Sequence, residues 1–114
     1  MKATTAIAGL GMTEMGKVYG RTATDFAAEA LALALDDAGL AKDDVDGLLM
    51  NANHSAEMAP MLQMSLGLED LTLVNAMSAY GSSAGTMLQY AAHAITTGQA
   101  NAVACLYADA PLSP

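Results

Sequence analysis

Apolar residues recur along one stretch of the chain with the period of a helix. Between Thr24 and Ala38 they return every three or four positions, which places them on one face. That face holds Ala27, Ala30, Leu31, Ala34, Leu35 and Ala38. Thr22 or Thr24 can cap the beginning of this helix, and Asp25 suits its first turn. Gly39 is expected to end it in a left-handed conformation.

Four short apolar runs have the length of strands. They comprise residues 4–12, which end in glycines; 47–51, which follow an acidic turn; 71–77, rich in strand formers; and 101–110. The last run is almost unbroken, which is typical of a strand buried on both faces in a parallel sheet.

Two more helices are predicted in the second half. Pro60 can open a short helix in the Met-rich segment 52–70. Residues 78–98, "SAYGSSAGTMLQYAAHAITTG", have the pattern of a strand end, a tight turn and a helix closed by glycine. Its apolar side would hold Met87, Leu88, Tyr90, Ala91, Ala94 and Ile95, and His93 would lie on a polar side. The order βαβαβαβ predicts a layered α/β fold with a mostly parallel sheet.

Composition narrows the classes of function. The chain has 114 residues and 54% hydrophobic content, enough for the core of one domain, and its apolar runs are too short to span a membrane. The net charge of −8 opposes a phosphate backbone, so nucleic-acid binding is not expected. A lone cysteine, Cys105, fits a reducing cytoplasm, and two isolated histidines give no metal-ligand spacing.

Two motifs are better explained by structure than by chemistry. The glycines of "GLGMTEMG" (9–16) do not have the spacing of a dinucleotide-binding loop, and we interpret them as a turn after the first strand. The acids of "DDVDG" (43–47) lack the ligand spacing of a calcium loop, and we expect a solvated turn. Cys105, in the middle of a strand, is expected to have a raised pKa and to be inert.

The segment "GSSAG" (81–85) satisfies the G-x-S-x-G pattern of hydrolases, with Ser83 at its centre. His93 follows ten positions later on the same helix, about 15 Å along its axis, so it cannot complete a triad with Ser83. A serine hydrolase is therefore the third functional hypothesis, and helix capping is the structural alternative for Ser82 and Ser83.

Taken together, three stretches resemble the thiolase superfamily, especially its sterol-carrier-protein-type thiolases and thiolase-like lipid-transfer proteins. They are residues 6–49, with "DAGL" and "VDGL"; 62–77; and 81–110, where a helix ending in "TG" precedes an apolar strand. The resemblance implies that residues 1–114 are the N-terminal portion of a thiolase-like domain with two similar α/β halves. The family's catalytic histidine and second cysteine would then lie beyond Pro114.

In this family, the strand–turn–helix segment carries a nucleophilic cysteine in a C-x-S-G pattern. Ungapped counting places the cysteine position on Gly81, with Ser83 on the motif serine, whereas a one-residue gap offers Tyr80 or Ser82. The resemblance therefore implies a site in which Tyr80, Ser82 and Ser83 donate hydrogen bonds near a thioester carbonyl. Backbone N–H groups after Gly81 would then face an enolate or oxyanion.

The resemblance also implies a function and partners. The first hypothesis is an acyl-CoA acyltransferase or retro-aldolase, with coenzyme A as part of the substrate and no covalently bound cofactor. The alternative is a non-catalytic subunit that supports a partner. A homodimer, with a possible interface at 58–66, and a small OB-fold, zinc-ribbon acyl-CoA-binding partner are further expectations.

Overall fold

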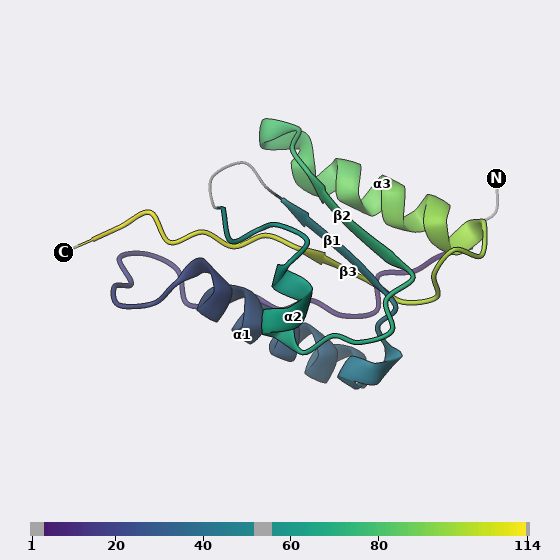
Figure 1. Ribbon diagram of the computed structural model, residues 1–114, viewed down its shortest axis with the longest axis horizontal. Coiled ribbons are helices and arrows are strands. Elements are labelled where there is room, and N and C mark those ends of the chain that lie inside the picture. The colour runs from purple at the N-terminus through teal and green to yellow at the C-terminus, as the bar shows by residue number, and fades with distance from the viewer. Residues whose placement is uncertain (1–3, 52–55, 114) are drawn as a thin grey trace.

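The computed structural model describes residues 4–51 and 56–113, which form three layers (Figure 1). Its elements are α1 (Ala23–Ala38), the 3₁₀ helix η1 (Lys42–Asp44), β1 (Gly47–Asn51), α2 (Leu62–Leu66), β2 (Leu73–Met77), the 3₁₀ helix η2 (Tyr80–Ser82), α3 (Ser83–Thr96) and β3 (Val103–Leu106). The strands form one parallel sheet in the order β2-β1-β3. α3 covers one face, and α1 and α2 lie on the other. The expected layered α/β fold with a parallel sheet is confirmed.

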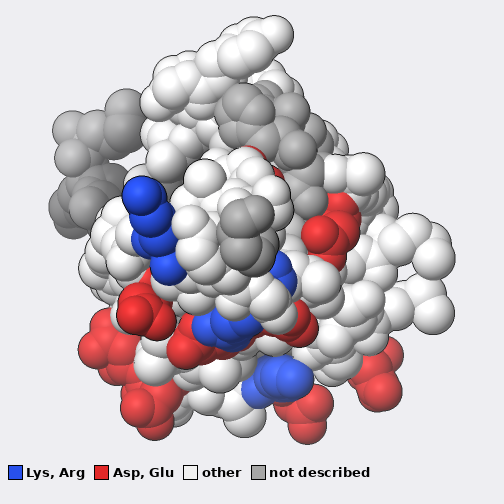
Figure 2. Space-filling model, turned by 90° about the vertical axis from the view of Figure 1, so that its left-hand side faces the viewer, with Lys and Arg blue, Asp and Glu red and all other residues white. Residues whose placement is uncertain are grey.

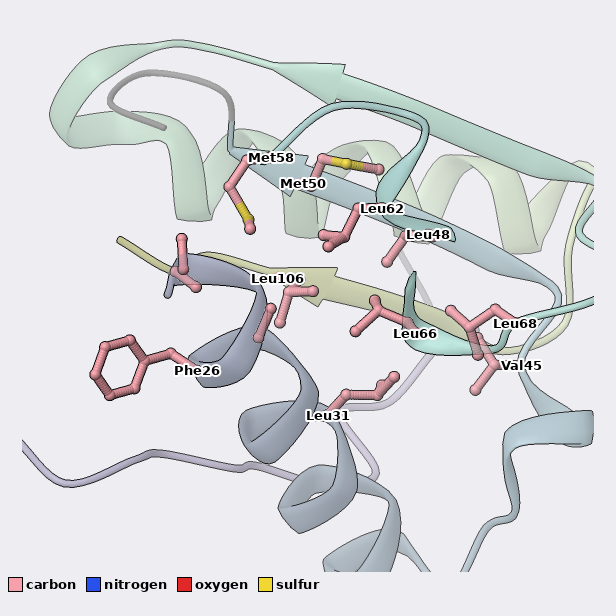
Figure 3. Packing of buried hydrophobic residues seen from close by; sticks show 13 residues of the cluster. Phe26, Leu31, Val45, Leu48, Met50, Met58, Leu62, Leu66, Leu68 and Leu106 are labelled. Atoms are coloured by element: carbon pink, nitrogen blue, oxygen red, sulfur yellow. The ribbon is translucent and has the colours of Figure 1, made fainter. Parts of the chain in front are cut away.

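The central strand β1 divides the apolar core into two parts. Leu48 and Met50 face α1 and α2, whereas Leu49 faces α3, and all three side chains are fully buried. Figure 3 shows the larger cluster, in which Leu31 of α1 and Leu66 of α2 converge on the sheet. A strand buried on both faces needs apolar residues at every position, which explains the unbroken "GLLM" run.

Asp46 ties the beginnings of the three strands together. Its carboxylate accepts the backbone N–H groups of Asn101 and Ala102 at 2.9 Å, just before β3. Its backbone carbonyl accepts the N–H of Thr72 at 2.8 Å, just before β2. The solvated turn expected at 43–47 is therefore wrong for this residue, because its hydrogen bonds reach chain segments that local sequence does not reveal.

Helix α1 begins and ends as predicted. Thr22 and Asp25 form a reciprocal capping box, and Gly39 ends the helix with φ 70°. The beginning of α1 also binds Glu57, whose carboxylate accepts the Thr24 hydroxyl at 2.6 Å and the Thr24 N–H at 3.0 Å. These bonds lower the pKa of Glu57. Within the described ranges no helix is long and apolar enough to cross a bilayer.

The strand predicted at 4–12 is not formed. This segment lies along α1, where a Cβ at Gly9 would collide with the Ala34 carbonyl and one at Gly11 with the Ala30 carbonyl. The Leu10 N–H donates to the Asp37 carboxylate at 2.9 Å instead of to a neighbouring strand. Gly9 and Gly11 therefore allow close contact with a helix, and their interpretation as a turn is wrong. Gly16, with φ 110°, has no atom within 4 Å of a built Cβ.

The remaining helices and strands agree with the prediction in position but differ in extent. The short helix after Pro60 is present as α2, and residues 52–55 of that Met-rich segment lie outside the described ranges. β3 covers only 103–106 and is half-buried apart from Leu106, because it pairs with β1 on one side only. On α3 the sheet covers a narrow stripe that includes Met87, Ala91 and Ala94, so Leu88 and Tyr90, predicted on the apolar side, are exposed.

Replacing Asp46 with Asn should destabilise the fold by about 1–3 kcal/mol, because the charged acceptor of several backbone N–H groups is lost. Equilibrium urea unfolding would measure the change. Asp43→Asn, at an exposed position of η1, is the matched control and should stay within about 0.5 kcal/mol of the parent. Equal loss in both variants would contradict the role assigned to Asp46.

Candidate functional site

The carboxyl ends of the three strands meet at one edge of the sheet. Asn51 ends β1 and pairs with Met77 at the end of β2, while Leu106 at the end of β3 pairs with Met50. In open α/β sheets this edge is where ligands bind. The chain continues from β2 into η2 and α3, and from β3 into Tyr107. Both of these segments therefore lie at the carboxyl edge of the sheet.

An open hollow of about 350 Å³ lies at this edge. Its lining comprises Asn51, Tyr80, Gly81, Ser83, Ala84, Met87 and Tyr107. Figure 2 looks onto this end of the molecule, where charged side chains gather toward the level of α1 and much of the upper part is uncharged. The segments that follow the three strands therefore form a concave surface with little charge, to which Tyr80 and Tyr107 contribute phenols and Asn51 a carboxamide.

Tyr80 occupies the turn from β2 into the helix in a left-handed backbone conformation, with φ 49°. Such a conformation costs a residue with a Cβ about 1–2 kcal/mol. The side chain gains nothing from burial, because it is 82% exposed at the hollow. Strain at a residue that lines a concave site is a common property of functional positions.

Ser83 holds this turn in place. Its side chain is 2% exposed, its hydroxyl donates to the Tyr80 carbonyl at 2.8 Å, and it accepts the Ala79 N–H at 3.0 Å. Ser82 is exposed, and its hydroxyl donates to the Ala79 carbonyl at 2.8 Å. The Ser83 hydroxyl is thus engaged with the backbone on both sides of the strained residue.

Gly81 lies at the start of the helical segment that runs from η2 into α3. The first N–H groups of a helix lack an acceptor within the helix itself. Here the Ser82 N–H donates to the Ala79 carbonyl at 3.1 Å and the Ser83 N–H donates to the Tyr80 carbonyl. Among the described residues the Gly81 N–H has no such acceptor, and Gly81 lines the hollow. A Cβ added to Gly81 would meet no other atom within 4 Å. The position could therefore hold a larger residue without a steric clash.

The structure places two of the three predicted site residues at the hollow and leaves other candidates apart. Tyr80 and Ser83 line the hollow, and Ser82 stands between them in the chain. His93 is exposed on α3 and is not part of the lining. Cys105 is half-buried in β3, its thiol donates to the Met87 carbonyl at 3.8 Å, and burial raises its pKa to about 11.

Asn51 and Tyr107 are site residues that sequence reasoning missed. Asn51 is the last residue of the predicted apolar run 47–51, and Tyr107 lies within the run 101–110. Neither was therefore considered as a polar site residue. The signal that could have found them is positional, because residues at the carboxyl ends of adjacent parallel strands meet at one edge. A separate hollow of about 110 Å³ between residues 13–18 and 109–112 contains none of the predicted site residues.

Comparisons with known proteins show what the chain is similar to. No family model matches the chain. Two curated relatives are each 39% identical over 101 residues: the steroid side-chain-cleaving aldolase of Thermomonospora curvata and the 17-hydroxy-3-oxo-4-pregnene-20-carboxyl-CoA lyase of Mycobacterium tuberculosis. The matches cover 88% and 86% of this chain and 25% of each relative, so the chain spans about a quarter of their length.

Solved structures agree with this result. The Ltp2-ChsH2(DUF35) aldolase is 36% identical with a TM-score of 0.79, over 88% of this chain and 26% of that one. The monomeric SCP2-thiolase like protein type 1 from Mycobacterium smegmatis has the same fold, with a TM-score of 0.71 at 19% identity over 92% of this chain and 23% of that one. The chain is thus similar in sequence to an aldolase and a lyase, and it has the fold of an SCP2-thiolase like protein. It matches the N-terminal part of that fold, as the resemblance implied.

The Tyr80→Asn variant should be about 1 kcal/mol more stable than the Tyr80→Ala variant, because Asn tolerates the left-handed conformation better than Ala does. Both changes remove the exposed phenol, so their difference isolates the backbone. Thermal or urea unfolding of the two variants measures it. Equal stability would show that residue 80 is not held in this conformation.

Ser83→Ala should lower stability by about 1–3 kcal/mol, since it leaves the N–H of Ala79 without its hydroxyl acceptor at a buried position. Ser82→Ala removes one hydroxyl bond at an exposed position and should cost less. Urea unfolding compares the two. A larger loss in Ser82→Ala would contradict the assignment of Ser83 as the residue that holds the turn.

Cys105 should make stability depend on alkaline pH. Its folded pKa of about 11 lies above the ordinary value of 9.0, so the stabilisation is complete below pH 9 and is lost as pH rises through 11. The free energy of unfolding should therefore fall over this range more in the parent than in Cys105→Ala. Iodoacetamide labelling at pH 8 should be slow until urea is added, and rapid native labelling would contradict the raised pKa.

Proposed function

We propose that the protein containing this chain cleaves a carbon–carbon bond in a branched 3-hydroxyacyl-CoA thioester by a retro-aldol reaction. The main support is the turn after β2, where Tyr80 and Gly81 line the hollow and no cysteine does. The names of the two curated relatives, an aldolase and a CoA lyase, support the same reaction class.

The reaction needs neither an acyl-enzyme nor an oxidant. A base removes the proton of the β-hydroxyl group, and the oxygen lone pair forms a carbonyl as the Cα–Cβ bond breaks. The electron pair of that bond becomes the enolate of the shortened thioester, which takes a proton at Cα. The site must therefore stabilise negative charge on the thioester oxygen, and preorganised N–H and O–H donors do so.

Each predicted site residue has a place in this proposal. The Gly81 N–H would donate to the thioester oxygen, and the exposed Tyr80 phenol would donate to the same oxygen or move a proton. Ser82, which is not part of the lining and whose hydroxyl donates to the Ala79 carbonyl, would support the turn. Ser83, whose hydroxyl is already bonded to the Tyr80 carbonyl, would act by positioning that residue.

Counting without a gap puts the family's cysteine position on Gly81. The left-handed backbone at the turn instead favours Tyr80 as the residue in that position. In either register the position carries no sulfur, which is the reason to propose aldol chemistry instead of acyl transfer. Because a Cβ at Gly81 would meet open space, steric exclusion does not explain the absence of a cysteine there.

We also propose that the protein works with a small acyl-CoA-binding subunit. One solved neighbour is described as a complex of Ltp2 with ChsH2, a DUF35 protein, and a subunit of this kind fits the OB-fold, zinc-ribbon partner implied by the family resemblance.

The homodimer and the cytoplasmic location stay predictions, as does the non-catalytic alternative. The engaged hydroxyl of Ser83 does not favour the serine-hydrolase hypothesis.

The test incubates the full-length protein, with and without a DUF35-type partner, with a 3-hydroxyacyl-CoA bearing two substituents at Cβ. Mass spectrometry should detect a ketone and the shortened acyl-CoA, while acetoacetyl-CoA with free CoA should give no thiolysis. Thiolysis without aldol cleavage would overturn the proposal. The absence of both products, with partner binding retained, would favour the non-catalytic subunit.

Tyr80→Phe in the same assay should lower kcat by about 10²-fold, within the range of a lost proton-transfer group. Tyr90→Phe is the matched control, because Tyr90 lies on α3 outside the lining of the hollow, and its kcat should be unchanged. Equal rates for Tyr80→Phe and the parent would remove Tyr80 from the site.

A further inference from the structure

Tyr107 is a second phenol at the hollow, supplied by a different strand from the one that leads to Tyr80. It follows directly after β3, whose last residue Leu106 pairs with Met50 of β1. Continuing this register places Tyr107 beside Asn51, and Asn51 itself pairs with the end of β2. Asn51 thus stands between the strand exit that leads to Tyr80 and the exit that carries Tyr107.

The alternation of strand side chains directs these groups to the same face of the sheet. Leu49 of β1 packs in the cluster beneath α3, so Asn51, two residues later, points the same way. Cys105 of β3 packs against that cluster too, which directs Tyr107 to the α3 face. The beginning of α3 lies on this face, and the hollow is lined from both sides.

Burial separates the two polar groups that β1 and β3 contribute. Asn51 is 8% exposed and lies on the inner side of the hollow, whereas Tyr107 is 51% exposed and lies at its rim. A phenol can both donate and accept a hydrogen bond. Its place at the rim leaves the hydroxyl accessible to a bound molecule.

We propose that the Tyr107 hydroxyl binds the oxygen atom on the β-carbon of the acyl group and thereby selects β-oxygenated acyl-CoA thioesters. This inference rests on the proposed function, which places the thioester oxygen at the helix beginning across the hollow. In the substrate, the thioester carbonyl carbon and the β-carbon each carry an oxygen and are separated by one carbon. The helix beginning on one side of the hollow can bind the thioester oxygen while Tyr107 on the other side binds the β-oxygen. A site that bonds a substrate oxygen also disfavours the analogue that lacks it.

Binding of uncleavable ligands tests this selection separately from catalysis. A 3-oxoacyl-CoA has the β-oxygen but no hydroxyl proton to lose, and the saturated acyl-CoA of equal length lacks that oxygen. Isothermal titration calorimetry is done without free CoA on the full-length protein with its partner. The Kd of the 3-oxo ligand should be about tenfold lower than that of the saturated ligand, which is the gain in affinity expected from one hydrogen bond.

Tyr107→Phe should reduce this ratio to near one while leaving the Kd of the saturated ligand unchanged. Tyr90→Phe should keep the parent ratio, and melting curves of both variants check that the fold is retained. An unchanged ratio in Tyr107→Phe overturns the inference. If the ratio falls as expected but the parent releases no ketone from the 3-hydroxyacyl-CoA, the proposed reaction fails and the binding role of Tyr107 stands.

Discussion

The hydrogen bonds of Asp46 are the constraint on which the rest of this molecule depends. A parallel sheet has no hairpin turns to set its register, because its strands are joined by long crossovers. Here one residue, placed immediately before the central strand, holds both neighbouring strands through its carboxylate and its backbone carbonyl. The register at the amino ends of the strands then determines which residues meet at the carboxyl ends, where Asn51, Tyr80 and Tyr107 share one hollow.

A second constraint acts at that opposite edge. The left-handed Tyr80 is unfavourable on its own, and the buried hydroxyl of Ser83 bonds the backbone on both sides of it. The stabilising group is therefore inside the fold and the strained group is at the surface. The side chain at position 80 is therefore not itself part of the bonds that hold the turn.

Local signals in the sequence were sufficient for much of the fold. Helix α1 has its cap, its apolar period and its terminal glycine within residues 22–39, and β1 has an unbroken apolar run. The segment 4–12 shows the limit of such signals, because its glycines meet α1 about 20–25 residues away in sequence, and strand propensity contains no information about that contact. The site was found in part for the same reason: Tyr80, Ser82 and Ser83 share one motif, whereas Asn51 and Tyr107 join them only through sheet pairing.

The tie between Glu57 and the beginning of α1 has a consequence for the connection that follows β1. This connection leaves the sheet at Asn51, and Glu57 returns it to a helix on the α1 side through hydrogen bonds that need an ionised carboxylate. The lowered pKa of Glu57 means that this attachment persists in mildly acidic solution and is released only when the carboxylate is neutralised. Met58, the next residue, is fully buried in the core, so in strong acid the loss of these polar bonds would leave apolar packing as the remaining hold on this part of the chain.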